Sequence, residues 1–189
     1  MCFDEHSGTH VDAPAHFGED SATVDAIDPQ DLVLPAVVLD VRERIGADAD
    51  ATITPDDVLA HERRHGPLPG RCAVLALTGW GARAHDPVAY LNADAGGTLH
   101  SPGFSAEVMA WMAEERPGVR GVGLDTASLD PGNSTDFAAH VAWLPTGRYG
   151  IENVANLDRV PLTGATLVVS VPRYRGGSGG PARVLALVG

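Results

Sequence analysis

The chain has 189 residues, of which 44% are hydrophobic and 20% charged, and this length and composition predict one globular domain over residues 1–189 with a buried core. Its 25 acidic residues against 13 basic ones give a formal net charge of −12, and because this charge repels phosphate groups we expect no nucleic-acid partner. No apolar run approaches the roughly 20 residues of a membrane span, and no signal-peptide pattern opens the chain, so we predict a cytoplasmic protein with no membrane partner. Cys2 and Cys72 form no CxxC pair, so we expect no disulfide framework.

The densest group of potential metal ligands lies in residues 6–16, HSGTHVDAPAH. A proline and a glycine in this segment disfavour a regular helix, so we predict an extended conformation. In a strand, side chains alternate with a period of two, and all four potential ligands have even numbers. The residues that would project to one side are His6, His10, Asp12 and His16. Gly8, the remaining even position, leaves room for an ion or a water molecule.

Imidazole nitrogens combined with a carboxylate suit a divalent transition metal, because calcium and magnesium prefer nearly all-oxygen ligand sets. Zn²⁺ is the first expectation and Mn²⁺ the second. The alternative is a polar loop whose histidines are solvated or hydrogen-bonded. The shared parity of the four residues favours the metal site.

Five short apolar runs predict buried strands. They cover residues 36–41, 72–77, 119–124, 166–171 and 183–188. Helical patterns lie between them: residues 55–65 follow the capping residue Thr54 and end before Gly66, and residues 106–116 follow Ser105. Because strands and helices alternate, the sequence predicts an α/β fold with a mixed β core and flanking helices.

A third helix is predicted from Ser134 or Thr135 to Trp143. One helical stripe of this segment contains Phe137, His140, Val141 and Leu144. The stripe places His140 on the inward side of the helix. Taken alone, this pattern indicates a core histidine that is hydrogen-bonded to a carbonyl, rather than a metal ligand.

Residues 61–65, HERRH, match the HExxH pattern of zinc proteases, in which two histidines on one helical face bind zinc and the glutamate acts as the base. The predicted helix is short and polar at this end, and Arg63 and Arg64 adjoin the supposed cation site. We therefore favour a solvated helix end and keep a zinc protease as an alternative.

Two loops have two interpretations each. Residues 125–130 follow a predicted strand, and their polar side chains either orient ligand imidazoles through hydrogen bonds or serve as ordinary turn and capping residues. These side chains are Asp125, Thr126, Ser128 and Asp130. The glycine-rich residues 176–181 predict a mobile turn that needs positive φ, and the alternative is a loop that closes over substrate or contacts an anion.

The segment HSGTHVDAPAHF resembles the HxGTHxDxPxH signature of the cyclase-like metal hydrolases, the family of bacterial kynurenine formamidase and isatin hydrolase. The stretches GLDTASLDPGNSTDFAAHVAWL and GIENVANLDRVPLTGATLVVSVPRYRGGSGGPARVLAL resemble the C-terminal half of the same family. Together these segments cover most of the chain. The resemblance implies the swivelling β/β/α fold of the family and metal-dependent hydrolysis of a small amide.

The signature carries implied roles for its own residues. In the formamidases its first two histidines and its aspartate bind metal, with the aspartate shared between two ions, which implies His6, His10 and Asp12 as ligands. Its last histidine donates and accepts protons, which implies His16 as the catalytic residue. We expect His16 to take a proton from a metal-activated water and to pass one to the departing nitrogen.

The resemblance also implies a second pair of ligands. In the formamidases a downstream histidine and a glutamate twelve residues later complete a second metal site, which implies His140 and Glu152. The site would hold one or two ions. No substrate-binding residue is implied.

The expected substrate is a small amide: N-formylkynurenine, as in an arylformamidase of tryptophan catabolism, or a cyclic amide such as isatin. The context GIENVANL around Glu152 is closer to the isatin hydrolases. The resemblance further implies a homodimer or a higher homo-oligomer. Members of the family carry a segment before the signature, which begins here at residue 6, so the alternative is a truncated paralogue that binds metal without activity.

Overall fold

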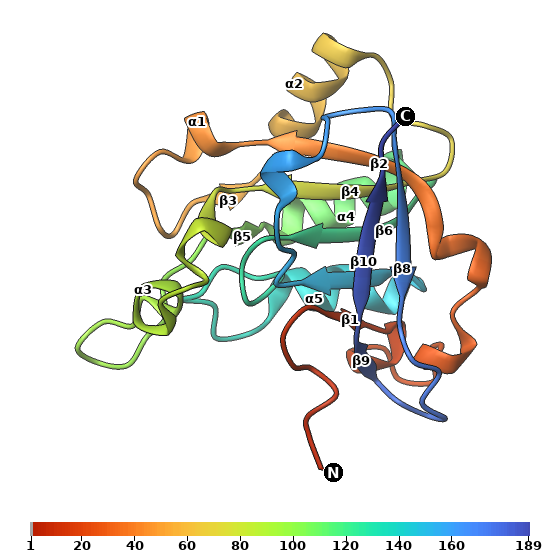
Figure 1. The fold of residues 1–189 in the computed structure, drawn as a ribbon, viewed down its shortest axis with the longest axis horizontal. Helices are drawn as coiled ribbons and strands as arrows, with labels where there is room; N and C mark the ends of the chain where they lie inside the picture. Colours follow the sequence, from red (N-terminus) through yellow and green to blue (C-terminus); the bar gives the residue numbers. More distant parts are fainter. Residues whose placement is uncertain (1) are drawn as a thin grey trace.

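The computed structural model describes residues 2–189 and shows a mixed α/β architecture (Figure 1). The strands are β1 (His10–Asp12), β2 (Val33–Asp40), β3 (Thr52–Ile53), β4 (Cys72–Leu77), β5 (Gly103–Phe104), β6 (Val119–Leu124), β7 (Tyr149–Glu152), β8 (Ala165–Ser170), β9 (Gly179–Pro181) and β10 (Arg183–Leu187). The α-helices are α1 (Arg42–Ile45), α2 (Pro55–His65), α3 (Pro87–Leu91), α4 (Ala106–Glu115) and α5 (Ala138–Trp143). Short 3₁₀ helices include η1 (Pro14–His16), η4 (Trp80–Arg83) and η6 (Leu157–Arg159).

Eight strands form one sheet in the order β10-β8-β2-β4-β6-β7-β1-β9, and β3 pairs with β5 in a second, two-stranded sheet. The central strands β2, β4, β6 and β7 are parallel, whereas the strands at both ends are antiparallel to their neighbours. In Figure 1, β8 and β10 cross the direction of β4 and β6, so the sheet curls strongly over its length. This mixed sheet agrees with the predicted fold class.

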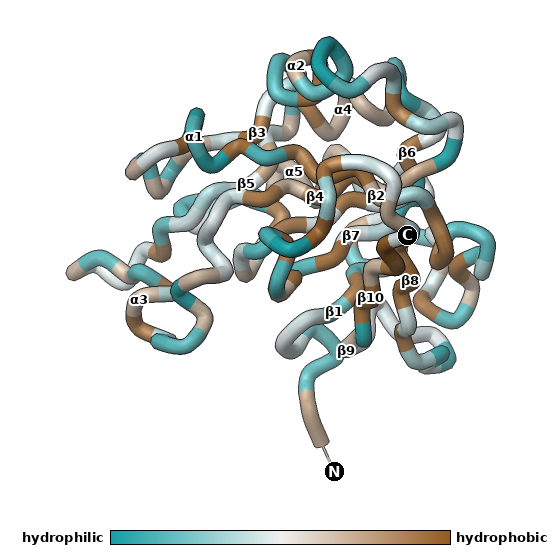
Figure 2. Tube along the Cα trace, turned by 45° about the horizontal axis from the view of Figure 1, so that its top comes forward, coloured by the Kyte–Doolittle hydropathy of each residue, from teal (hydrophilic) through white to brown (hydrophobic). Residues whose placement is uncertain are grey.

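Two hydrophobic cores lie on the two faces of the sheet. One contains Trp143 and Met109 from the helices α5 and α4, together with Phe104. The other lies between the central strands and the antiparallel strands and contains Leu75 and Leu167. Figure 2 shows the central strands in brown, with hydrophilic segments mainly at the periphery. Complete burial of each such large apolar side chain contributes roughly 1.5–3 kcal/mol, and both faces must be covered because the parallel strands are apolar on each side.

The predicted strands are present with shifts of at most three residues at their ends. The runs at 72–77 and 119–124 coincide with β4 and β6. Helix α2 begins and ends as predicted, and the Asp57 carboxylate accepts hydrogen bonds from the N–H and hydroxyl of Thr54 (2.8 and 3.0 Å). This helix spans 11 residues, and no helix in the part of the chain that the structure describes is long and apolar enough to cross a membrane.

The third predicted helix was placed too early and its stripe was partly wrong. Helix α5 starts only at Ala138, because Phe137 adopts a left-handed backbone conformation (φ 52°) that interrupts a helix. His140 and Leu144 are buried as predicted, but Phe137 and Val141 are exposed. Trp143 takes the inward position instead.

The prediction of one extended segment over residues 6–16 is also wrong. Only His10–Asp12 forms a strand, β1. Gly8 turns the chain with φ 63°, and Pro14 opens the 3₁₀ helix η1, in which His16 is the last residue. The side chains therefore gather around Asp12 through two changes of backbone direction, not through the regular alternation of a strand.

Candidate metal centre

The pairing of β1 with β7 brings two predicted ligands together. In this antiparallel pair His10 lies directly opposite Glu152, and cross-strand partners on one face have side chains within about 5.5 Å. His10 Nε2 lies 3.4 Å from Glu152 Oε2 and 3.3 Å from Asp12 Oδ1. The other ring nitrogen of His10 donates to the carbonyl of Gly8 (2.9 Å). This bond leaves Nε2 free to bind a metal.

Asp12 stands at the centre of the cluster with a side-chain exposure of only 1%. Its Oδ1 accepts a hydrogen bond from His6 Nδ1 (2.6 Å). Its Oδ2 is buried without a hydrogen-bond partner, and within residues 2–189 it is the one such side-chain atom. His140 Nε2 lies 3.6 Å from this oxygen. A buried, unpartnered carboxylate oxygen is unfavourable unless another group, such as a cation, satisfies it.

His140 reaches the cluster from helix α5. Its Nδ1 donates to Asp130 Oδ2 (2.5 Å), and its Nε2 lies 3.1 Å from Glu152 Oε1. Asp130 also accepts from the backbone N–H groups of Ala139 and His140 (2.8 and 3.2 Å). A single carboxylate thus caps α5 and fixes the orientation of the imidazole ring.

Of the polar residues 125–130, Asp130 therefore takes the predicted role of orienting an imidazole. Asp125 does not, because its carboxylate accepts from the N–H groups of Thr78, Gly79 and Gly81 (3.0–3.1 Å). Thr126 and Ser128 bond within their own turn. The sequence could not separate Asp130 from Asp125, because each aspartate can accept hydrogen bonds from nearby backbone groups.

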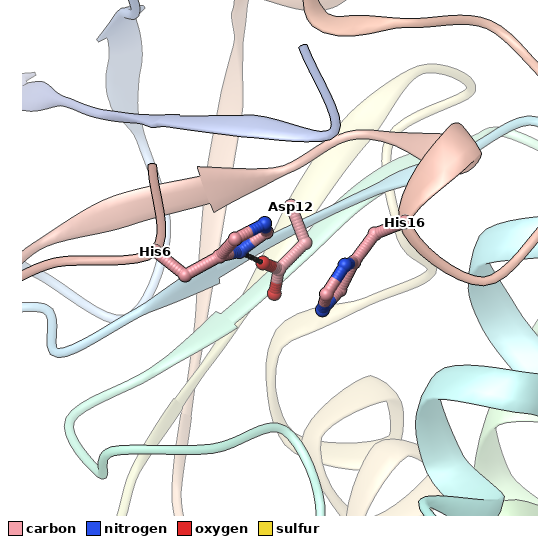
Figure 3. A group of neighbouring side chains, drawn as sticks. All are labelled: His6, Asp12 and His16. Atoms are coloured by element: carbon pink, nitrogen blue, oxygen red, sulfur yellow. Dashed lines mark hydrogen bonds and ion pairs between the residues drawn. The ribbon is translucent and has the colours of Figure 1, made fainter. Parts of the chain in front are cut away.

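His16 faces Asp12 from η1. Its ring stacks on that of His6 with centroids 4.0 Å apart, and Figure 3 shows His6 and His16 on either side of the Asp12 carboxylate. Burial, with a further contribution from the neighbouring histidines, lowers the pKa of His16 to about 4. The ring is therefore neutral near pH 7.

The carboxylates draw positive charge into this buried site. Burial opposes the charge on His140, but hydrogen bonds to Asp12, Asp130 and Glu152 outweigh it and raise the pKa of His140 to about 11. The pKa of His10 is raised in the same way, since Asp12 outweighs burial. Burial and the nearby Asp12 raise the pKa of Glu152. These directions mean that the site favours added positive charge, which a divalent cation would supply.

The donor atoms form two overlapping groups that fit a metal. His6, Asp12 and His16 make one group, and His10, Asp12 and Glu152 make the other. In each group, ligand atoms lie within 4.8 Å of one another. Asp12 belongs to both, as expected of a bridging carboxylate. The structure thus brings all six predicted site residues together, and it places His16 close enough to join the first group.

The cavity at this cluster has a volume of about 390 Å³. Besides the predicted residues it is lined by Phe17, Phe137, Ser128 and Asn153. No substrate-binding residue is predicted from the sequence: the helical stripe places Phe137 on an inward face, and no motif marks Asn153. Both have positive φ, a conformation that is uncommon for residues with a side chain and that a sequence pattern does not reveal.

The glycine-rich segment 176–181 packs against His6 and β1. Its residues Gly179–Pro181 are strand β9, which pairs with β1. Ser178 Oγ lies 2.9 Å from His6 Nε2, and its N–H donates to Glu5 (2.9 Å). A Cβ on Gly179 would lie 2.6 Å from the His6 ring, so this glycine permits the close approach. The segment is thus a strand with a preceding turn that packs on His6.

The HExxH segment lies elsewhere and does not form a protease site. The Glu62 carboxylate accepts from Nε and Nη2 of Arg116 (2.9 and 2.8 Å). His61 and His65 line a different cavity, of about 1000 Å³, between α1 and α2. Because Glu62 is held in this ion pair, it is not available as a base for a cation on the two histidines.

Comparisons with known proteins identify the family of this chain. A family model described as "Putative cyclase" matches residues 1–131. The isatin hydrolase of Roseibium aggregatum is 35% identical over 196 residues, which cover 100% of this chain and 73% of that protein. The kynurenine formamidase of Salinibacter ruber is 32% identical over 186 residues, with coverages of 95% and 74%.

Solved structures agree with these matches. Isatin hydrolase A from Ralstonia solanacearum superposes with a TM-score of 0.91 at 39% identity and covers 98% of this chain and 73% of its own. A potential metal-dependent hydrolase with cyclase activity gives a TM-score of 0.73 at 25% identity, with coverages of 98% and 80%. The resemblance predicted from the signature is confirmed, and so is the fold class.

Proposed function

Since this chain belongs to the putative cyclase family, we propose that it hydrolyses the carbon–nitrogen bond of a small cyclic amide of the isatin type. Relatives named isatin hydrolase cover 98–100% of this chain, and their structures superpose with TM-scores of 0.91 to 0.92. The substrate class is taken from these relatives. The amide-hydrolase class itself is shared by the formamidases.

The unpartnered Asp12 Oδ2 is the structural observation that carries the proposal. This oxygen is buried 3.6 Å from His140 Nε2, and the carboxylate as a whole also lies beside the imidazoles of His6 and His10 and within 4.8 Å of Glu152. Such a set of donors suits a divalent transition metal. We assign His6, His10 and Asp12 to a first ion, and His140 and Glu152, with Asp12 shared, to a second. This division differs from the two geometric groups, because it keeps His16 for proton transfer and pairs His140 with Glu152, 3.1 Å away. Zn²⁺ is the first choice and Mn²⁺ the second.

A divalent cation bound there would supply Lewis acidity that polarises the amide carbonyl and makes water more acidic. The protein side chains then have two tasks. Asp130, Gly8 and Ser178 hold the imidazoles of His140, His10 and His6 in fixed orientations. Orientation of this kind lowers the cost of reaching the reactive geometry.

We assign proton transfer to His16. Because its ring is neutral near pH 7, it is able to accept a proton from the attacking water while the water oxygen bonds to the carbonyl carbon. The same proton then passes to the departing nitrogen as the carbon–nitrogen bond breaks. The products are a carboxylate and an amine on one opened ring.

N-Formylkynurenine is a second candidate substrate. It is favoured by the match to kynurenine formamidase over 95% of this chain. Both candidates are secondary amides attached to an aromatic ring, and Phe17 and Phe137 line the cavity with their rings 5.6 Å apart. These rings would contact the aromatic part of either substrate.

The first experiment measures metal and activity together. We expect one or two zinc or manganese ions per chain by elemental analysis, with hydrolysis of isatin that a chelator abolishes and the metal restores. Asp12→Asn should lose both metal and activity. Asp20→Asn is the matched control, because Asp20 is exposed in the same segment and its φ of 59° is one that asparagine tolerates. Metal without hydrolysis of either candidate would contradict the proposed activity and support the metal-binding paralogue.

We also propose a homo-oligomer. Strand β10 has a free edge, and its outward face carries Leu185 and Leu187, which are 48% and 58% exposed beside Val33 at 54%. An exposed apolar sheet face next to a free edge favours association. Light scattering that gives the mass of a single chain at micromolar concentration would contradict this proposal.

A further inference from the structure

Asn153 follows Glu152 directly and is held rigidly at the cavity. Its φ of 55° lies in the left-handed region, where a residue with a side chain is strained by about 1 kcal/mol. Hydrogen bonds compensate: its N–H donates to the carbonyl of Thr126 (2.8 Å) and its carbonyl accepts from Thr9 Oγ1 (2.6 Å). Both backbone groups of Asn153 are therefore occupied, and the side chain is aimed by a fixed backbone.

Tyr90 holds one end of the Asn153 side-chain amide. The Tyr90 hydroxyl lies 2.9 Å from Asn153 Oδ1 and 3.1 Å from the backbone carbonyl of Asp125. Tyr90 is itself anchored, since its carbonyl accepts from Trp80 Nε1 (2.8 Å). Burial raises the pKa of Tyr90, so its hydroxyl keeps its proton at neutral pH.

These two contacts determine which way the amide points. A phenol has one proton, so the Tyr90 hydroxyl is not able to donate to two oxygens at once. The Asp125 carbonyl only accepts, and it takes that proton. The remaining contact is satisfied when the Asn153 NH₂ group donates to the Tyr90 oxygen. In this orientation the NH₂ group and the carbonyl oxygen of the Asn153 amide have exchanged places, and the orientation of such an amide is assigned from its hydrogen bonds.

The exchange leaves the side-chain carbonyl oxygen of Asn153 as the free end. Among residues 2–189, Tyr90 is the only residue that bonds this side chain. Asn153 is partly exposed and lines the same cavity as His16 and Glu152. A rigid hydrogen-bond acceptor thus lies in the wall of a cavity whose ionisable groups form the cation site.

We propose that the Asn153 side-chain carbonyl accepts a hydrogen bond from the amide N–H of the substrate and selects secondary amides over N-alkylated ones. This inference rests on the proposed function and adds a specificity-determining residue to it. An N-methyl group removes the donor and places a carbon against a fixed oxygen. A site that is built to bond an N–H rejects an analogue without one, because its own polar group then stays unpaired.

The test compares isatin with N-methylisatin in the metal-loaded enzyme. We expect kcat/KM to favour isatin by about tenfold to a hundredfold, after correction for the ratio of their rates of alkaline hydrolysis. Asn153→Gly, which tolerates the positive φ, should reduce this ratio at least fivefold. Asn156→Gly is the matched control: Asn156 has a φ of 57° and is exposed outside the cavity, so its variant should keep the ratio.

Binding provides a readout that does not need turnover. Calorimetry should show that 2-oxindole, an unreactive lactam, binds at least tenfold more tightly than N-methyl-2-oxindole to the wild type, and equally within about threefold to Asn153→Gly. Tyr90→Phe should also weaken the preference, because the amide is then free to rotate.

Failure of the inference and failure of the proposed function are distinguishable. A wild type that does not hydrolyse isatin contradicts the proposed function, while the oxindole pair still tests Asn153. Equal use or equal binding of the N–H and N-methyl compounds overturns the inference. So does an unchanged preference in Asn153→Gly, and so does an absence of binding to both lactams.

Discussion

The substitution Asp130→Asn tests how the protein prepares His140 for a metal. In the wild type the Asp130 carboxylate accepts three hydrogen bonds: one from His140 Nδ1 (2.5 Å) and two from backbone N–H groups in the first turn of α5 (2.8 and 3.2 Å). This arrangement places the proton of neutral His140 on Nδ1 and leaves Nε2 to face Glu152 and Asp12.

An asparagine at position 130 has only one oxygen for these three donors. If that oxygen caps the helix, the NH₂ group faces His140 Nδ1, which must then accept, and the proton moves to Nε2, where it blocks metal binding. If the oxygen faces His140, a backbone N–H loses its acceptor. We expect the first outcome to weaken the ion held by His140 and Glu152 by about tenfold to a hundredfold, and the second to cost about 1–2 kcal/mol of folding free energy.

Three measurements check this prediction. Metal titration gives the affinity, urea unfolding gives the stability, and ¹⁵N chemical shifts of the imidazole in the metal-loaded protein give the His140 tautomer. Asp136→Asn is the matched control, because Asp136 is exposed in the same loop and contacts Ser134 rather than His140. Unchanged affinity, stability and tautomer in Asp130→Asn would refute the reasoning.

Three further predictions concern separate groups. His16→Ala should keep its metal but lose at least about a hundredfold in kcat, whereas loss of metal would make His16 a ligand. Burial raises the pKa of the Cys72 thiol to about 12, so Ellman's reagent at pH 8 should titrate the exposed Cys2 and reach Cys72 only in denaturant; rapid labelling of both thiols in the native protein would contradict this. Burial, followed by the charge on His65, lowers the pKa of His61, so the folded state favours the neutral ring. The contribution of His61 to the free energy of unfolding should therefore be fully present above pH 6.5 and should be lost as the pH falls below this value. Urea unfolding at pH 5 and 7.5 should show a smaller fall in His61→Gln, and an unchanged fall would exclude this group; replacing both His61 and His65 should leave metal content unchanged.

The arrangement of the centre suggests how folding and metal binding are coupled. Its donors come from the loop before β1 and from β1, η1, α5 and β7, so the site exists only when these elements have assembled. A cation bound there stabilises the folded state by an amount that rises with the logarithm of its affinity. Removing the metal should therefore lower the midpoint of thermal unfolding, and the protons drawn onto His10 and His140 by the carboxylates compensate only in part.

The local pattern of the sequence determined much of this protein. Buried runs such as 72–77 and 119–124 predicted strands because parallel strands with both faces covered need continuous apolar residues. The capping residues Thr54 and Ser105 predicted the starts of α2 and α4, since capping uses hydrogen bonds within three residues. The density of histidines near the N-terminus predicted the candidate centre, because metal ligands often lie a few residues apart.

Only the tertiary structure decided how these ligands meet. The register of β1 on β7 sets His10 opposite Glu152, and the fold brings Ser178 onto His6, Asp130 onto His140 and Tyr90 onto Asn153. Periodicity predicts which face of an element is buried, but not which other element will cover it. That choice follows from packing two cores on a curled sheet, where residues far apart in the chain contribute to one free-energy minimum, so the orientation of each imidazole and of the Asn153 amide is a property of the assembled fold.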